Sequence, residues 1–147
     1  MFMLQAIDQA RAAKDDHGRV GAVLVQHGKV ISVAGSSSLE FPTIHAEHAA
    51  LEKAGWLNDP TPKPNSKIYV TLQPCLKRSG GEKGCSWDII NSGIEKVVYG
   101  ELDTHFEWGE SLKFFNSHGV MFEQIPYTAI RKECWKIFCE NNKSMKK

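Results

Sequence analysis

Three side chains of the sequence have the chemistry of a zinc-ligand set: the imidazole of His45 and the thiols of Cys75 and Cys85. A catalytic zinc ion takes three protein ligands of these kinds and keeps its fourth position for water, whereas a structural zinc ion uses four. The set therefore predicts one catalytic Zn2+ per chain. Two other interpretations stay open at this point: a closed structural zinc site, and buried thiols that bind no metal.

The residues next to these ligands indicate which reaction a zinc ion would catalyse here. Glu47 lies two residues after His45, and Pro74 directly precedes Cys75. The order H-x-E…P-C…C is typical of zinc deaminases, in which the glutamate moves protons and does not bind the metal. Zinc lowers the pKa of its bound water to about 7 and so supplies hydroxide. We expect Glu47 to take the proton of that water, pass it to the ring nitrogen and protonate the leaving ammonia.

The elements predicted around these residues place them at strand and helix ends. His45 and Glu47 lie in the first turn of a helix expected over residues 44–54, with Thr43 as its cap. Cys75 follows a buried strand over residues 68–72, and functional groups of open α/β sheets gather beyond such strand ends. Cys85 starts a further helix that ends near residue 93, and the positive end of this helix favours the thiolate form.

The rest of the chain alternates predicted strands and helices. A short turn at residues 27–29 joins the first two strands into an antiparallel hairpin, and alternating units follow it. This order predicts a single domain over residues 1–147 with an α/β fold, a three-layer α/β/α sandwich around a five-stranded mixed sheet. The expected strands outside the site cover residues 20–25, 30–35, 96–99 and 119–123, and the expected helices cover 2–14, 111–117 and 126–140.

Composition restricts the partners of the protein. The formal net charge of +1 gives no global field toward nucleic acid or a membrane, so we expect neither as a partner. No apolar run approaches the ~18 residues of a membrane span. Residues 1–4 lack the features of a signal peptide, so we expect a cytoplasmic protein with reduced thiols.

With these residues named, the chain resembles the cytidine-deaminase-like superfamily over about residues 1–125, and within it the pyrimidine deaminases of riboflavin biosynthesis. Residues 70–75 (V-T-L-Q-P-C) look like the V-T-L-E-P-C of that group, residues 20–23 match its V-G-A-V strand, and residues 78–80 resemble the R-L-S-G stretch of its fungal members. Nine residues separate Cys75 from Cys85, where most superfamily members have two and riboflavin-pathway deaminases also carry a long loop.

The resemblance implies the same sandwich, one zinc ion per chain and a homo-oligomer, which we expect to be a dimer. It also implies an aminopyrimidine substrate, with the ribosylaminopyrimidine phosphate intermediate of riboflavin biosynthesis as the leading expectation. The sequence departs from the bacterial pattern in two places: His17-Gly18 stands where Asn-Pro precedes the strand, and the reductase domain of bifunctional members does not follow. Other substrates stay open: another nucleobase, nucleoside or nucleotide, or tRNA. A non-catalytic zinc domain stays open as well.

A small set of residues could contact such a substrate. The cations of the loop between the cysteines suit a phosphate, and aromatic faces suit a planar base. The candidates are His17, Lys77, Arg78, Lys83, His105 and Trp108. Each also has an ordinary role, as a turn residue, a solvated loop face or part of a small hydrophobic cluster.

Three further residues have metal-binding side chains but a simpler interpretation. His48 lies three residues after His45, and we expect it on the helix surface or beside the ligands rather than among them. Cys134 and Cys139 lie in the last predicted helix with Trp135 and Phe138, and we expect them to pack in the core.

Overall fold

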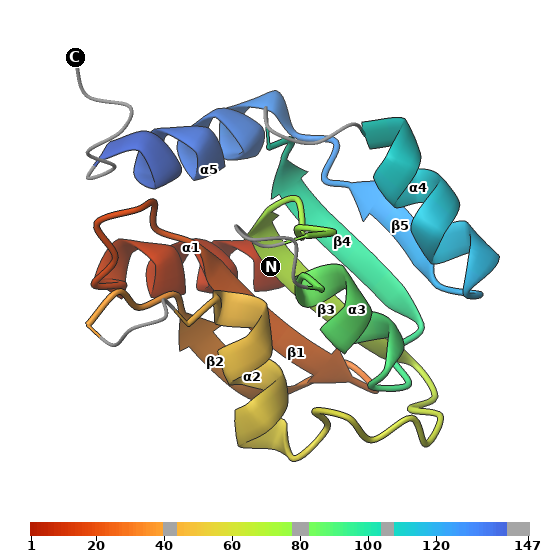
Figure 1. Cartoon of the computed structure of the whole chain (residues 1–147). Coiled ribbons are helices and arrows are strands. Elements are labelled where there is room, and N and C mark those ends of the chain that lie inside the picture. The colour runs from red at the N-terminus through yellow and green to blue at the C-terminus, as the bar shows by residue number, and fades with distance from the viewer. Residues whose placement is uncertain (40–43, 78–82, 104–107, 141–147) are drawn as a thin grey trace.

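The computed structural model describes residues 1–39, 44–77, 83–103 and 108–140 (Figure 1). They form a five-stranded sheet in the order β2-β1-β3-β4-β5. The strands are β1 (Gly21–Gln26), β2 (Lys29–Gly35), β3 (Ser66–Leu72), β4 (Lys96–Glu101) and β5 (Met121–Gln124). β1 is antiparallel to β2 and β3, and β3, β4 and β5 are mutually parallel neighbours, so the predicted mixed sheet is confirmed.

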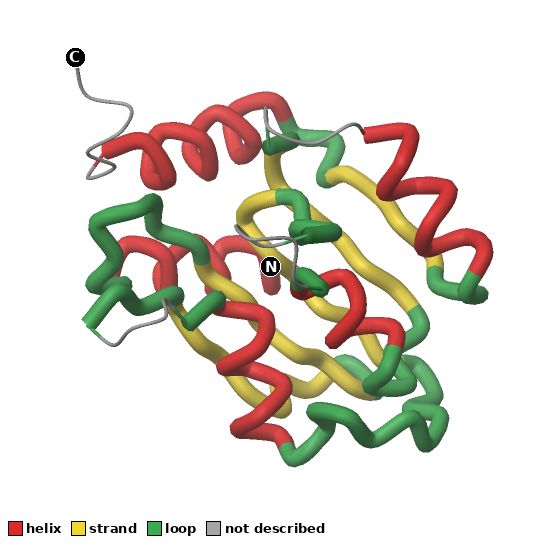
Figure 2. The backbone as a smooth tube through the Cα atoms, viewed as in Figure 1, coloured by secondary structure: helices red, strands yellow, loops and turns green. Residues whose placement is uncertain are grey.

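Helices cover both faces of this sheet (Figures 1 and 2). α1 (Phe2–Ala12) and α5 (Thr128–Glu140) pack on one face, around a core that includes Met3, Ile7 and Ile137. α2 (Ala46–Ala54), α3 (Cys85–Ile90) and α4 (Trp108–Ser117) pack on the other, around Leu51, Ile89 and Phe115. The predicted three-layer α/β/α sandwich is therefore confirmed.

The hairpin at the start of the sheet follows from its residues. Residues 21–25 of β1 are all buried, as their apolar character predicts for a strand covered on both faces. His27 and Gly28 have φ angles of 52° and 74°, the left-handed values of a two-residue turn between twisted strands. This turn lies at the edge of the sheet opposite to the metal ligands.

Several boundaries differ from the sequence prediction. α1 ends at Ala12 instead of residue 14, because Lys14 forms a β-bridge with Ser37. Ser37 also pairs with Ile44, so α2 begins at Ala46 with His45 as its N-cap, and the predicted cap Thr43 lies outside the described residues. α4 begins three residues before its predicted start, at Trp108, and α5 begins two residues after its predicted start.

Strand directions bring distant segments to one edge of the sheet. Because β1 runs antiparallel to β2 and β3, the start of β1 lies beside the ends of β2 and β3. The Gly21 N–H donates to Thr71 Oγ1 at 3.1 Å across this edge. Residues 14–20, 36–39 and 73–77 adjoin these strand ends, and residues 44–45 join them through the Ser37–Ile44 pair, so the predicted ligands His45 and Cys75 lie at this edge.

Candidate metal centre

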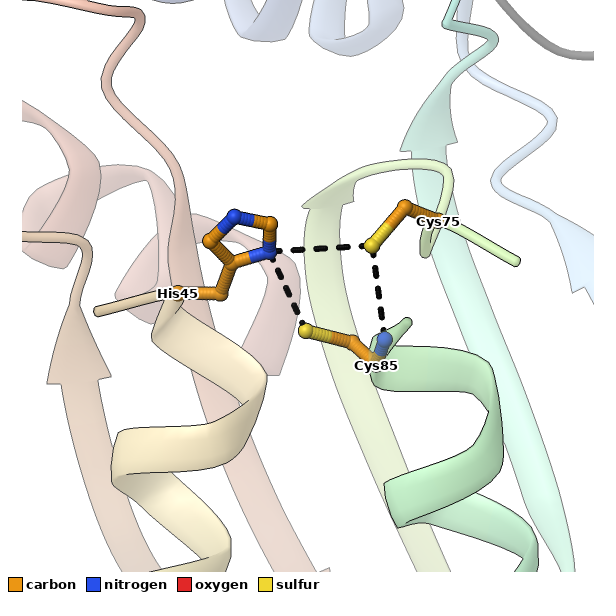
Figure 3. A group of neighbouring side chains, drawn as sticks. All are labelled: His45, Cys75 and Cys85. Carbon is orange, nitrogen blue, oxygen red and sulfur yellow. Dashed lines mark hydrogen bonds between the residues drawn. The ribbon is translucent and has the colours of Figure 1, made fainter. Parts of the chain in front are cut away.

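Figure 3 shows the predicted ligands together at this edge. His45 is the N-cap of α2, Cys75 lies in the loop after β3, and Cys85 is the first residue of α3. His45 Nδ1 lies 3.2 Å from Cys85 Sγ and 3.7 Å from Cys75 Sγ. Both cysteine side chains are buried, and all three ligand atoms lie within 4.8 Å of one another.

These distances fit a tetrahedral zinc ion. Zn–N and Zn–S bonds of about 2.0–2.3 Å place ligand atoms roughly 3.5 Å apart. Hydrogen bonding from Cys85 and from His45 lowers the pKa of the Cys75 thiol to about 4, against burial, which raises it. A thiolate is the form that binds zinc. Among the described residues the cluster contains these three ligands and no fourth, as in a catalytic centre rather than a closed structural one.

The two cysteines are held together by the backbone at the start of α3. The Cys85 N–H donates to Cys75 Sγ at 3.3 Å, and the Ser86 N–H donates to the Cys75 carbonyl at 3.0 Å. The Ser86 hydroxyl donates to the Pro74 carbonyl at 3.2 Å. Gly84 leaves room for this packing, because a Cβ there would lie 2.4 Å from the Cys75 carbonyl oxygen. The roles of Gly84 and Ser86 could not be predicted from sequence, in which adjacency to a ligand was their only signal.

Glu47 lies in the first turn of α2, next to the cluster. Its side chain is buried, and burial raises the pKa of its carboxyl to about 7 although the nearby His45 lowers it. Cys75 also acts on this carboxyl and raises its pKa. A buried carboxyl beside a metal centre can accept a proton and return it within one site.

Gln73 joins the site to the loop after β4. Its side chain is buried, accepts a hydrogen bond from the Asp103 N–H at 3.1 Å and donates one to Ser111 Oγ at 2.7 Å. These bonds connect the end of β3 to α4. The sequence indicated Gln73 only as part of the motif over residues 70–75, with no role of its own.

The other predicted contact residues have diverse positions. His17 is exposed in a turn before β1, and Lys77 and Lys83 are exposed and form an isolated β-bridge with each other. Lys83 Nζ lies 4.5 Å from the centre of the Trp87 ring. Trp108, expected in a loop, is the first residue of α4 and is 48% exposed. Arg78 and His105 lie outside the described residues.

His48 and Cys134 occupy the places expected from their simpler interpretations, whereas Cys139 does not lie in the core as expected. His48 lies one turn beyond His45 and contacts Asp88, so it stands beside the ligand cluster and is not part of it. Cys134 is buried in the core on the α1 and α5 face, while Cys139 is only partly buried. None of the described helices has the length and apolar character needed to cross a membrane.

Comparisons with known proteins agree with this geometry. Residues 1–101 match the family described as the cytidine and deoxycytidylate deaminase zinc-binding region. The tRNA-specific adenosine deaminase of Aquifex aeolicus is 33% identical over 135 residues, which cover 85% of this chain and 83% of that protein. The diaminohydroxyphosphoribosylamino-pyrimidine deaminase of Schizosaccharomyces pombe is 36% identical over 105 residues, which cover 69% of this chain but 25% of that protein. The structure of the Aspergillus oryzae Rib2 deaminase superposes with a TM-score of 0.78 at 19% identity, covering 98% of this chain and 92% of that one, which shows the shared fold.

Proposed function

Because the chain belongs to the cytidine and deoxycytidylate deaminase zinc-binding family and is a zinc-dependent deaminase, we propose that its substrate is an aminopyrimidine that carries a phosphate. The leading candidate is the ribosylaminopyrimidine phosphate intermediate of riboflavin biosynthesis. The observation that carries the proposal is the long segment between Cys75 and Cys85, whose two ends pair through Lys77 and Lys83.

The catalytic roles follow from the positions of the site residues. When bound by His45, Cys75 and Cys85, zinc supplies hydroxide from water at neutral pH. Glu47 is buried in the first turn of α2 beside that centre, where its carboxyl can take the proton of the water. The same carboxyl then passes that proton to the ring nitrogen, takes the remaining proton of the hydroxyl group added to the ring carbon, and gives it to the amino group, which leaves as ammonia while the carbonyl forms. No other carboxylate is needed for these transfers, because they follow one another at one place.

The cations of the segment between the cysteines support a phosphate-bearing substrate. Lys77 follows the ligand Cys75 by two residues, and Lys83 precedes the ligand Cys85 by two. Both side chains are exposed, so a phosphate can approach them from solvent, and Lys83 would reach it from its place over the Trp87 ring. Charge-assisted hydrogen bonds from lysines are common in phosphate recognition. His17 and Trp108 are proposed to contact the ring or ribose at the same edge, and we expect the active form to be a homodimer.

A second candidate is deamination of adenosine in tRNA. It is favoured by the identity to the Aquifex aeolicus protein, which extends over 83% of that protein's length. A tRNA substrate requires a broad basic surface and binding that weakens steeply with salt. The formal net charge of +1 gives this candidate the lower rank.

The experiment is an ammonia-release assay with the zinc-loaded protein on a panel of substrates. The panel contains the ribosylaminopyrimidine phosphate, its dephosphorylated form, cytosine, cytidine, deoxycytidylate, guanine and a tRNA anticodon stem-loop. We expect turnover of the first compound, and Glu47→Gln should keep zinc but abolish ammonia release. Turnover of tRNA alone would replace the leading candidate by the second.

The lysine contribution has its own controls. Lys77→Ala and Lys83→Ala should each raise KM for the phosphorylated substrate about tenfold with little change in kcat, because a charged hydrogen bond contributes about 1.4 kcal/mol or more. Lys29→Ala is the matched control, since Lys29 is exposed at the opposite edge of the sheet. Equal effects of Lys77→Ala on the phosphorylated and dephosphorylated substrates would refute phosphate recognition.

A further inference from the structure

α2 and α3 lie side by side on one face of the sheet, and their first turns carry metal ligands (Figures 1 and 3). His45 is the N-cap of α2 and Cys85 is the first residue of α3. One turn further along, His48 Nδ1–H donates to Asp88 Oδ2 at 3.1 Å. The two helices are therefore joined at two successive levels, first by the ligand cluster and then by this pair.

The second level matters because the three ligands are not held in the same way. Cys75 and Cys85 are fixed to each other by backbone hydrogen bonds at the start of α3. His45 belongs to a different helix, and the Ser37–Ile44 pair fixes the chain just before it, so its distance from the two thiols depends on how this start of α2 lies against α3.

Ala46 in the first turn of α2 packs in the core against the sheet, but the side-chain hydrogen bonds described between α2 and the sheet are at the far end of the helix. Ser32 Oγ donates to the Ala50 carbonyl at 2.7 Å, and Lys53 Nζ donates to the Val33 carbonyl at 3.0 Å. Both bonds join α2 to β2, and neither reaches the first turn. Among the described residues, the His48–Asp88 bond joins α2 to α3 by side chains in addition to the contacts between the ligands.

We propose that His48 and Asp88 are positioning residues that set the register of α2 against α3 and so hold His45 at the correct distance from the two thiols. Metal–ligand distances in proteins agree with their standard values to about 0.2 Å, so a slip of α2 that moves His45 away from the thiols weakens binding. The side chains are 32% and 23% exposed, so the bond is partly shielded from water. The inference rests on the zinc site and is independent of which substrate the enzyme uses.

The test is zinc affinity, measured by competition with a chromogenic chelator, together with the melting temperature of the metal-free protein. His48→Ala removes the bond, and we expect the zinc dissociation constant to rise about tenfold, the lower end of the range for groups that orient metal ligands. His48→Asn places an amide nitrogen near the position of Nδ1 and should restore affinity to within about twofold of the original. Excess zinc should return kcat of His48→Ala to the original value.

Glu52→Ala is the matched control. Glu52 lies on the same helix face, 4.0 Å from His48 Nε2, and its side chain is 72% exposed, so its removal should leave zinc affinity unchanged. If His48→Ala does not fold, Asp88→Ala removes the same bond from the other helix. In a double-mutant cycle, the combined variant should bind zinc no more weakly than either single variant.

Two results would overturn the proposal. One is a zinc affinity of His48→Ala within twofold of the original while the melting temperature falls, since this is the pattern of a purely structural contact. The other is an equal loss of zinc affinity in His48→Ala and His48→Asn, since loss of the hydrogen bond would then not be the cause of the weaker binding. Absence of turnover on every small substrate would contradict the proposed function and leave the zinc-affinity result unaffected.

Discussion

Gly84 is the position where the smallest change to the chain should do the most damage to the metal centre. The Gly84→Ala substitution adds a Cβ that would lie 2.4 Å from the Cys75 carbonyl oxygen and 2.7 Å from Cys75 Sγ. Ordinary contacts begin at 3.4 Å, so backbone or thiol must move by about 1 Å. The backbone of Gly84 is extended and suits any residue, so the obstacle is space alone.

A movement of about 1 Å is roughly five times the ~0.2 Å within which zinc–ligand distances agree with their standard values. The displaced group is Cys75 itself, held through the Gly84 N–H bond to the Leu76 carbonyl at 2.9 Å and through Ser86. We therefore expect zinc affinity to fall about a hundredfold or more, which corresponds to about 2.7 kcal/mol. Ammonia release at limiting zinc should fall in proportion.

The assay is chelator competition on the purified variant, with circular dichroism to confirm that the metal-free chain is folded. Gly109→Ala is the matched control, because a Cβ at Gly109 meets nothing within 4 Å and the residue lies in α4. That variant should bind zinc normally and be as stable as the original or slightly more so. A Gly84→Ala protein that binds zinc within threefold of the original would refute the reasoning about space at Cys75.

Three further predictions concern the scaffold. Lys63→Met should lower the free energy of unfolding in urea by about 3 kcal/mol, because the nearly buried Lys63 Nζ donates to three backbone carbonyls. These carbonyls are far from the site, so zinc affinity should not change. A zinc affinity that falls together with stability would contradict this prediction. Burial raises the pKa of Tyr99 to about 12, above the value near 10 of an unfolded tyrosine, so stability is lost as pH rises from 10 to 12. Tyr99→Phe should flatten this part of a curve of unfolding free energy against pH. An unchanged curve would argue against this role of Tyr99. Removal of zinc by a chelator should lower the melting temperature and increase amide hydrogen exchange. The increase should be larger in the first turn of α2 than in that of α3, because Ser86 at the start of α3 holds Cys75 without the metal. Equal increases in both turns would contradict this prediction.

The ligand set could be predicted from sequence because its chemistry restricts the residue types. His45, Cys75 and Cys85 are brought together as predicted, and the resemblance to the cytidine-deaminase-like superfamily is confirmed by the family match over residues 1–101. The sheet could be predicted for a similar reason, since burial on both faces requires continuous apolar strands such as β1. Roles of Glu47, His17 and Lys77 in catalysis or binding remain predictions.

Boundaries and positioning contacts could not be predicted, because they depend on residues far apart in the sequence. Lys14 leaves α1 to pair with Ser37, a partner that no local pattern indicates. The same holds for His48 and Asp88, which are 40 residues apart. Gly84 was visible only as one of several glycines in a loop, and its importance depends on the proximity of the Cys75 carbonyl.

The ligands of the metal centre are positioned in two ways, and substitutions affect the two differently. The two thiols are positioned within ten residues of chain by backbone hydrogen bonds, so a substitution there acts directly on ligand geometry. The imidazole is positioned by the packing of α2 and by the Ser37–Ile44 pair before it, so substitutions act on it through the placement of that helix. Gln73 adds a third connection, from the end of β3 to α4 through Ser111. Because zinc chemistry fixes the ligand atoms, we expect differences of substrate between members of such a family to arise in the segments around them.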